Sequence, residues 1–172
     1  NIFFYRENDE NIVPETVALP LRFEIENLAN YTFSSFNGVT SEIVDNPVAG
    51  SINNSDKVLQ VNKNQGVQYF AGTQVSIDEP VDFSNNQTIT MKVYSPKQDI
   101  PIRMALERGD GTGQVFVEAI IPTANEWIEI EFDFSGVFIP TTDYQRVLLY
   151  PEYIEGVSGD GSIYYFDDID NK

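Results

Sequence analysis

Apolar and polar residues alternate along most of the chain after residue 19, which is the pattern of half-buried β-strands. In the first such stretch, LPLRFEIEN at residues 19–27, apolar residues occupy one side and Arg22, Glu24 and Glu26 occupy the other. Further stretches with strand character are DKVLQVNK, GVQYFAGTQVSI, QTITMKVYS, DIPIRMALE, QVFVEAIIP, EWIEIEFDF, RVLLYPEY and SIYYFDDID. The pattern therefore predicts about nine or ten short strands.

Turn-forming segments such as SPKQ, RGDGTG, PTAN and EGVSGDG separate these stretches. Helical periodicity is almost absent, and the one stretch that could form a helical turn is LANYTF, residues 28–33. Short strands at fairly regular spacing predict an all-β protein, either an antiparallel β-sandwich or a barrel.

Alternation also sorts side chains between the core and the outer faces of the sheets. In DIPIRMALE the apolar residues are expected in the core, with Arg103 and Glu107 on the opposite side. Trp127 faces outward with the acidic residues of EWIEIEFDF, and Phe116 and Glu118 share the outer side of QVFVEAIIP. At least one outer face is therefore expected to combine aromatic rings with charged hydrogen-bonding groups.

Length and composition fit one globular domain. The chain has 172 residues, of which 41% are hydrophobic, with 12 Phe and 9 Tyr. Residues 1–18 are interpreted as a lead-in from a preceding domain, and residues 19–172 as the β-sandwich domain. Since the chain starts without Met or a signal peptide, we expect a piece of a larger, exported protein.

The net charge and the residue types limit the classes of binding partner and of chemistry that the chain can support. With 27 acidic and 10 basic residues the net charge is −17, which would repel nucleic acid and anionic membrane surfaces. No apolar run approaches the ~18 residues of a membrane span. Because the sequence contains no Cys and no His, disulfides, thiolate sites, His-ligated zinc and a Ser-His-Asp triad are excluded. Neutral sugars and cations are compatible with this composition.

An ordered set of motifs runs through the strand pattern: LRFEIEN, EIVDNPVAGSINNSDKVLQV, VQYFAGTQVSI, PVDFSNNQTITMKVYSP, NEWIEIEFDFSG and YYFDDI. Over residues 19–170 this set resembles the jelly-roll carbohydrate-binding modules of polysaccharide-degrading bacteria, most of all the family 4, 16 and 22 group. It also resembles the domain that ends some surface glycan-binding proteins. The resemblance implies a two-sheet antiparallel jelly-roll sandwich whose first and last strands are adjacent. Phe70 stands where this group often has Trp, so weaker stacking is expected there.

The resemblance implies a non-catalytic, monomeric domain that binds a polysaccharide, beside neighbouring domains of the same larger chain and outside the cell or on its outer surface. A neutral glycan would escape repulsion by the acidic chain, and a β-glucan such as laminarin is the first expectation by resemblance alone. Two alternatives stay open: a calcium-stabilised adhesion or spacer domain, and a small β-sandwich glycan hydrolase or lyase. The carboxylates of EIEFD follow one strand, whereas glycoside hydrolysis needs a pair across a cleft.

Acidic residues crowd two places in the sequence. Glu24 and Glu26 are two positions apart, so they project from one side of the first strand, and Asp167, Asp168 and Asp170 lie together near the C-terminal end. In the resembling modules a structural calcium joins the first and last strands, which implies Glu24, Glu26 and either Asp167 or Asp168 as ligands. Oxygen ligands of this kind suit Ca²⁺. Strand alternation turns Asp167 and Asp168 to opposite faces, and the sequence does not choose between them. Solvated surface acid is the alternative, and it is preferred for Asp170.

A sugar ring presents apolar C–H faces and a rim of hydroxyls, so its binding face needs aromatic rings beside carboxylates, amides or arginine. The outer-face candidates are Gln68, Phe70, Arg103, Glu107, Phe116 and Glu118. Further aromatic candidates are Tyr94, Tyr150, Tyr153 and Trp127. A packing role is the alternative for each ring, and it is favoured for Trp127. Whether the ligand lies on a sheet face or at loop tips stays open.

Overall fold

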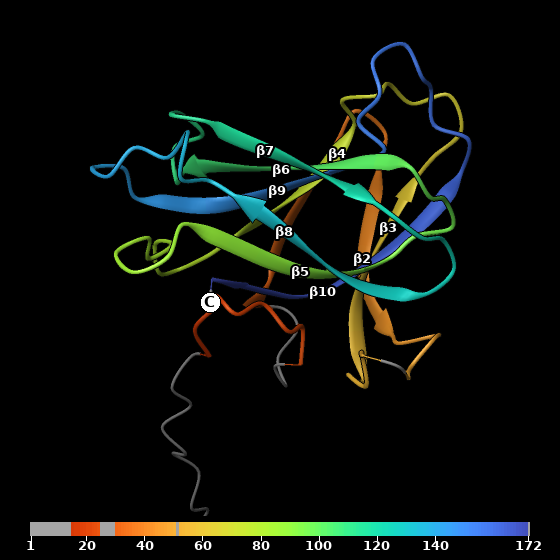
Figure 1. The fold of residues 1–172 in the computed structure, drawn as a ribbon, viewed down its shortest axis with the longest axis horizontal. Helices are drawn as coiled ribbons and strands as arrows, with labels where there is room; N and C mark the ends of the chain where they lie inside the picture. Colours follow the sequence, from red (N-terminus) through yellow and green to blue (C-terminus); the bar gives the residue numbers. More distant parts are fainter. Residues whose placement is uncertain (1–14, 25–29, 51, 172) are drawn as a thin grey trace, which may run out of the picture.

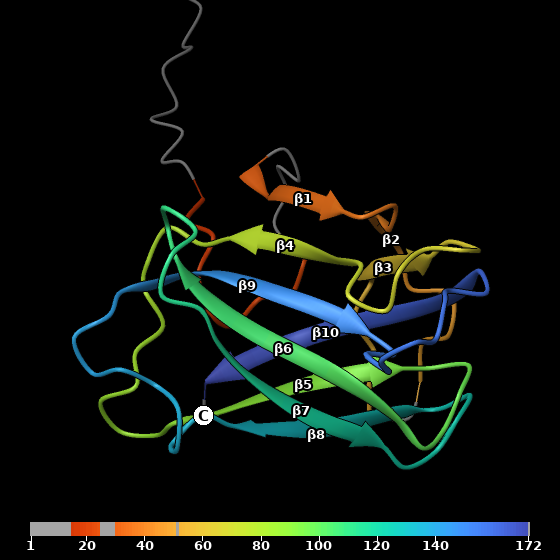
Figure 2. The same cartoon turned by 90° about the horizontal axis from the view of Figure 1, so that it is seen from above.

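The computed structural model of the protein describes residues 15–24, 30–50 and 52–171. Within them, ten β-strands form two five-stranded sheets that lie face to face (Figures 1 and 2). The "β6 sheet" has the order β1-β4-β9-β6-β7, and the "β10 sheet" has the order β2-β3-β10-β5-β8. The strands are β1 (Thr32–Phe36), β2 (Thr40–Asp45), β3 (Lys57–Lys63), β4 (Gly72–Ser76), β5 (Thr88–Tyr94), β6 (Ile100–Arg108), β7 (Val115–Ile121), β8 (Trp127–Asp133), β9 (Tyr144–Pro151) and β10 (Ser162–Asn171).

All neighbouring strands in both sheets are antiparallel. Consecutive strands of the described chain stay in one sheet only at the β2–β3 and β6–β7 hairpins, and every other connection crosses to the opposite sheet. Such crossing is typical of a jelly roll. The predicted all-β fold, a two-sheet antiparallel jelly-roll sandwich, is confirmed.

The core lies between the two sheets and follows the expected alternation. Ile102, Met104 and Leu106 of β6 are fully buried, and so are Phe132 of β8 and Phe166 of β10. Removing apolar surface of this kind from water contributes about 25 cal/mol per Å², which is the main force holding the sheets together. No helix in the described part of the chain is long and apolar enough to cross a membrane.

The predicted strand in LPLRFEIEN is wrong in the part of it that the structure describes. Only Leu21 pairs there, through Leu21 N to Ile169 O (2.9 Å) and Ile169 N to Leu21 O (3.1 Å). Phe23 leaves the extended conformation with φ of 59°. Its ring is buried, as the alternation predicted, and packs on Tyr31 with the centroids 5.4 Å apart. Residues 25–29 lie outside the described part. The Leu21 bridge still places the start of LPLRFEIEN beside β10, whereas the first strand, β1, lies in the other sheet.

Three other stretches differ in detail from the sequence interpretation. In LANYTF, Asn30 lies in a 3-10 turn, and strand β1 begins two residues later, at Thr32. GVQYFAGTQVSI becomes a strand only at Gly72, because a turn closed by Ala71 N to Gln68 O (3.0 Å) precedes it. Val17 of the predicted lead-in is buried and exchanges hydrogen bonds with Asp78 (2.8 and 2.7 Å). The end of the lead-in therefore packs on the domain, while the boundary at residue 19 stays a prediction.

Candidate functional site

The outer face of the β6 sheet gathers most of the residues that the sequence suggested for sugar contact. Strand register aligns them in three rows. The first row is Phe36, Gly72, Tyr150, Arg103 and Glu118; the second is Ser34, Gln74, Leu148, Ala105 and Phe116; the third is Thr32, Ser76, Arg146 and Glu107. In the second row Ala105 and Leu148 are buried, and Phe116 is exposed at the β7 end of the row.

Arg103 is the most constrained polar residue of this face. Its Cζ lies 4.1 Å from the centroid of the Phe116 ring and 3.4 Å from that of the Tyr153 ring. Its Nε and Nη2 both donate to Glu118 Oε1, at 2.8 and 2.6 Å. Cation–π contacts and a charge-assisted pair together restrict the guanidinium to one orientation. The face therefore presents a preorganised Arg–Glu pair.

Five aromatic rings form a continuous chain beside this pair, which we call the "aromatic ridge": Phe36, Tyr150, Tyr153, Tyr69 and Phe70. Successive centroids are 5.4, 5.7, 5.1 and 5.1 Å apart, and all four contacts are edge-to-face. The ridge ends at Phe70, which is 40% exposed, and Phe116 on the other side of Arg103 is 47% exposed. Apolar ring surface thus remains open to a ligand at both positions.

Gly72 permits one contact of the ridge. A Cβ at this position would lie 2.5 Å from the carbonyl oxygen of Leu149 and about 3 Å from the rings of Phe36 and Tyr150. Any side chain would push these groups apart. The glycine at the start of β4 therefore lets the two rings meet across the strand.

The charges on this face are paired. Glu107 accepts from Gln114 Nε2 (2.6 Å) and lies 3.9 Å from Arg146 Nη1, while Arg103 pairs with Glu118. Burial raises the pKa of the Tyr150 hydroxyl, and the Gln114 side chain partly offsets that effect. A chain with a net charge of −17 thus carries a face of balanced charge. Its hydrogen-bonding groups suit neutral hydroxyls.

The structure brings together Phe70, Arg103, Glu107, Phe116, Tyr150 and Tyr153 from the sequence candidates. Gln68 is exposed in the turn that also carries Phe70. Sequence reasoning missed Phe36 and Tyr69. Phe36 follows LANYTF, the stretch for which the pattern allows a helical turn. Tyr69 precedes Phe70 in the run QYF, and that run is itself a signal of an aromatic loop.

Tyr94 and Trp127 lie on the other sheet, on β5 and β8. Tyr94 contacts both Trp127 (5.9 Å between centroids) and Tyr165 (6.1 Å). Trp127 is only 4% exposed, and its Nε1 donates to the carbonyl oxygen of Val48 at 3.0 Å. It faces outward as alternation predicted, but the segment carrying Val48 covers it. These rings are therefore separate from the β6 face.

The acidic residues expected to bind a metal have different surroundings. Asp168 forms ion pairs with Lys92 (2.6 Å) and Arg22 (3.4 Å), and Glu24 Oε1 accepts from Lys57 N (2.9 Å). Glu26 lies outside the described part. Among the described residues, no three acidic side chains form a group that could hold a metal ion.

Asp167 differs from these acidic residues in its burial and in its hydrogen bonding. It is fully buried; its Oδ1 accepts from Asp168 N (2.9 Å), and its Oδ2 has no hydrogen-bond partner in the described part of the chain. Burial raises its pKa to about 6, against the lowering effects of the Ser55 side chain and the Asp168 amide. A β-bulge interrupts β10 at this point, where Asp168 has φ of 44°. The bulge breaks simple alternation and leaves Asp167 buried and Asp168 ion-paired.

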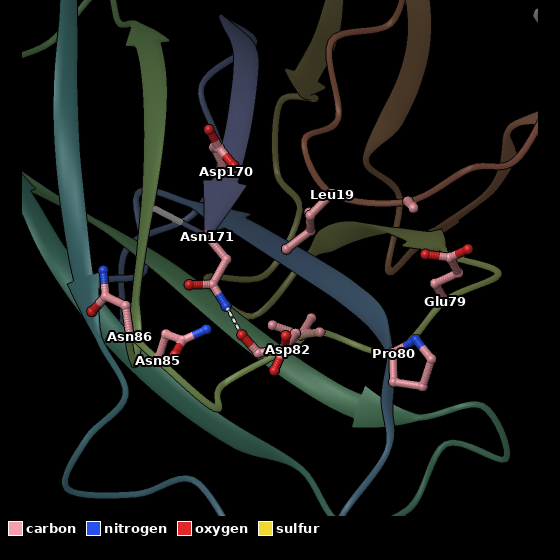
Figure 3. Close-up of a pocket in the computed structure, with 10 residues that line it drawn as sticks. Leu19, Glu79, Pro80, Asp82, Asn85, Asn86, Asp170 and Asn171 are labelled. Carbon is pink, nitrogen blue, oxygen red and sulfur yellow. Dashed lines mark hydrogen bonds between the residues drawn. The ribbon is translucent and has the colours of Figure 1, made fainter.

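A small polar cavity of about 280 Å³ lies at the C-terminal end of β10 (Figure 3). Its acidic lining residues are Glu79, Asp82 and Asp170, and Asn171 Nδ2 donates to the backbone oxygen of Asp82. The Ser84 hydroxyl and amide hold the pKa of Asp82 below its usual value. Since no aromatic ring lines this cavity, it lacks the apolar platform found on the β6 face.

No family model matches the sequence, and no curated protein matches it. Solved structures with the same fold include the carbohydrate-binding modules of the β-sandwich superfamily studied for promiscuous specificity (TM-score 0.57, 18% identity, 87% of this chain and 60% of that one). They also include the family 11 module from Clostridium thermocellum with a β-1,3-1,4-mixed-linked tetrasaccharide (TM-score 0.54, 17% identity, 90% and 92%). A third is an exo-β-agarase, of which the chain spans only a quarter (TM-score 0.63, 10% identity, 92% and 25%). The chain thus shares the β-sandwich fold of carbohydrate-binding modules, as the motif order predicted.

Proposed function

We propose that the protein is a non-catalytic carbohydrate-binding domain that holds a neutral polysaccharide across the outer face of the β6 sheet. The observation that carries the proposal is the Arg103 guanidinium fixed between the Phe116 and Tyr153 rings and bound to Glu118. The family 11 module of the same fold, solved in complex with a β-1,3-1,4-mixed-linked tetrasaccharide, supports it. In line with the family resemblance, we expect an exported, monomeric domain beside other domains of a larger chain.

In the proposed complex, the C–H faces of two sugar rings stack on the exposed rings of Phe116 and Phe70. Sugar hydroxyls exchange hydrogen bonds with the Arg103–Glu118 pair and with Glu107. Each new hydrogen bond replaces one to water, so we expect weak affinity, in the ~µM to mM range. A β-glucan such as laminarin is the first ligand to test.

Affinity electrophoresis on a panel of polysaccharides tests the proposal. The parent should be retarded by at least one neutral glycan, and Phe116→Ala and Arg103→Ala should each weaken binding about tenfold. Ile163→Ala is the matched control, since Ile163 is exposed on β10 of the other sheet. The proposed face is wrong if both variants bind as tightly as the parent.

The same panel distinguishes the alternative functions. Retardation without chemical change supports a binding module. New reducing or unsaturated ends would identify a hydrolase or lyase, and neither retardation nor product would identify an adhesion or spacer domain. Glycoside hydrolysis requires two carboxylates on opposite sides of a cleft, whereas the proposed binding role does not.

We also propose that Asp167 is a ligand of a structural calcium ion. The support is its buried Oδ2, which lacks a partner among the described residues, because an orphaned buried carboxylate oxygen is unfavourable unless a cation or proton satisfies it. Glu24 and Glu26 are the proposed ligands from the N-terminal side. Asp168 is the weaker candidate, since Lys92 and Arg22 already neutralise it. Calcium would attach the residues around Leu21 to β10 more firmly.

Chelator and calcium titrations monitored by thermal unfolding test this site. Calcium at about 100 times its Kd should stabilise the fold by about 2.7 kcal/mol. Asp167→Asn should remove the response, whereas Asp168→Asn should keep it while losing an ion pair. Identical melting of chelated and calcium-loaded parent would exclude the metal.

A further inference from the structure

Lys63, the last residue of β3, is a fully buried lysine. Its Nζ donates to the backbone oxygens of Glu152 (2.6 Å), Pro151 (2.7 Å) and Tyr69 (3.3 Å). An ammonium group has three N–H donors, and here each meets a carbonyl. A buried charge is unfavourable unless it is satisfied in this way, so the chain retains this lysine at a cost in desolvation.

The three carbonyls belong to the two loops that carry the aromatic ridge. Tyr69 and Phe70 lie in the loop between β3 and β4, and Tyr153 follows Pro151 and Glu152 in the loop between β9 and β10. Figures 1 and 2 show these loops, yellow and blue, side by side. The Tyr69 and Tyr153 rings meet across them, with centroids 5.1 Å apart. One ammonium group therefore hydrogen-bonds to both loops that carry the aromatic ridge.

Glu152 links Lys63 to the ligand-facing side. Its backbone has φ of 50°, which is unfavourable for a residue other than glycine and persists where surrounding contacts hold it. Its buried carboxylate binds Lys97 Nζ (2.6 Å) and accepts from the Tyr164 hydroxyl (3.3 Å). The next residue, Tyr153, stacks on Arg103. Contacts thus run from Lys63 through the Glu152 backbone to the Arg103 guanidinium.

We propose that Lys63 is a positioning residue for the carbohydrate face: its ammonium group holds the two aromatic loops at the spacing that the ridge and Arg103 require, without touching the ligand. This proposal rests on the proposed function. It predicts that removing one N–H donor from Lys63 loosens the ridge even though the sandwich stays folded.

Deprotonation of Lys63 offers a direct way to remove one N–H donor. Burial lowers its pKa to about 8, and Lys97 adds to the lowering, while Glu152 and Asp160 oppose it. Above that pH a neutral amine has two N–H donors for three carbonyls. Between pH about 8 and the ordinary value of 10.5 the unfolded chain binds the extra proton, so Lys63's contribution to stability rises with pH in this window. Binding should weaken with rising pH while this contribution to stability improves, a combination that a purely structural role would not produce.

The test measures affinity for the responsive polysaccharide from pH 6.5 to 9.5, using the parent, Lys63→Met and Lys57→Met. Lys57 is the control because it lies on the same strand in a surface pair with Asp45. The parent and Lys57→Met should lose several-fold in affinity above pH 8, and Lys63→Met should be about tenfold weaker than the parent at pH 7 and insensitive to pH. The proposal is overturned by a pH-independent parent or by a folded Lys63→Met that binds like the parent.

Near-UV circular dichroism up to pH 9 tests the role of Lys63 without a glycan, and therefore independently of the proposed function. If no glycan binds the parent at any pH, the proposed function fails. A tyrosine signal that changes near pH 8 in the parent would still support positioning of the aromatic loops, and an unchanged signal would overturn it. This parent measurement also decides the matter if Lys63→Met does not fold.

Discussion

The outer face of the β6 sheet and the outer face of the β10 sheet each carry a cluster of aromatic rings. On the β6 face, Phe116 and Phe70 remain 47% and 40% exposed, beside an Arg–Glu pair. On the β10 face, Trp127 is covered by the segment that carries Val48, and its N–H is satisfied there. Identical strand alternation thus produces an open aromatic surface on one sheet and a second packing layer on the other. Loop coverage, not the outward direction of a side chain, decides which aromatic face can meet a ligand.

The largest expected effect separates the two faces by stability. Trp127→Ala should lower the free energy of unfolding by about 3 kcal/mol, because a buried ring packed on Tyr94 leaves a cavity. Phe116→Ala should lower it by less than about 1 kcal/mol, because half of its ring is already in water. Urea unfolding measures both values. Equal losses would remove the distinction between the faces.

A second effect concerns Asp167, on the β10 sheet. Its folded pKa of about 6 exceeds its ordinary value of 3.8, so in metal-free protein the folded state binds the proton more strongly between these values. Its contribution to stability therefore falls as pH rises from about 4 to 6, by about 3 kcal/mol at most. Thermal unfolding in chelator should show this slope in the parent and a reduced slope in Asp167→Asn. Parallel pH profiles would mean that Asp167 does not titrate in this window.

A third and smaller effect is expected from changing the planar guanidinium of Arg103 on the β6 face. Arg103→Lys keeps the charge but loses the planar group that stacks between Phe116 and Tyr153. We expect about a fivefold loss of glycan affinity with little change in melting temperature, measured by affinity electrophoresis. Unchanged affinity would show that charge alone suffices at this position.

The smallest expected effect is that of salt. The charges on the β6 face are paired and the proposed ligand is neutral, so raising NaCl from about 0.05 to 0.5 M should change affinity by less than about twofold. Isothermal titration at the two salt concentrations measures it. A steep salt dependence would instead indicate an anionic ligand and would contradict a neutral glycan.

The strand pattern predicted the sandwich well because it depends on neighbouring residues. DIPIRMALE and SIYYFDDID correspond to β6 and β10, and the outward direction of Arg103 and Phe116 follows from alternation within one strand. Alternation placed Phe23 correctly on the buried side but did not foresee the turn in its backbone, and it failed at Asp167–Asp168, where a bulge changes the register of β10. At both places the backbone departs from an extended strand, and a two-residue repeat assumes that no such departure occurs.

The amino-acid sequence by itself determined the all-β class, the outward and inward sides of the central strands and the absence of Cys and His chemistry. Only the tertiary structure decided that Val48 covers Trp127 across 79 residues of sequence and that Lys63 reaches the carbonyls of Pro151 and Glu152. The physical reason is that the side on which a residue falls is set by the two-residue repeat of its own strand. Its exposure and its polar partners depend on loops that meet only after the two sheets have packed.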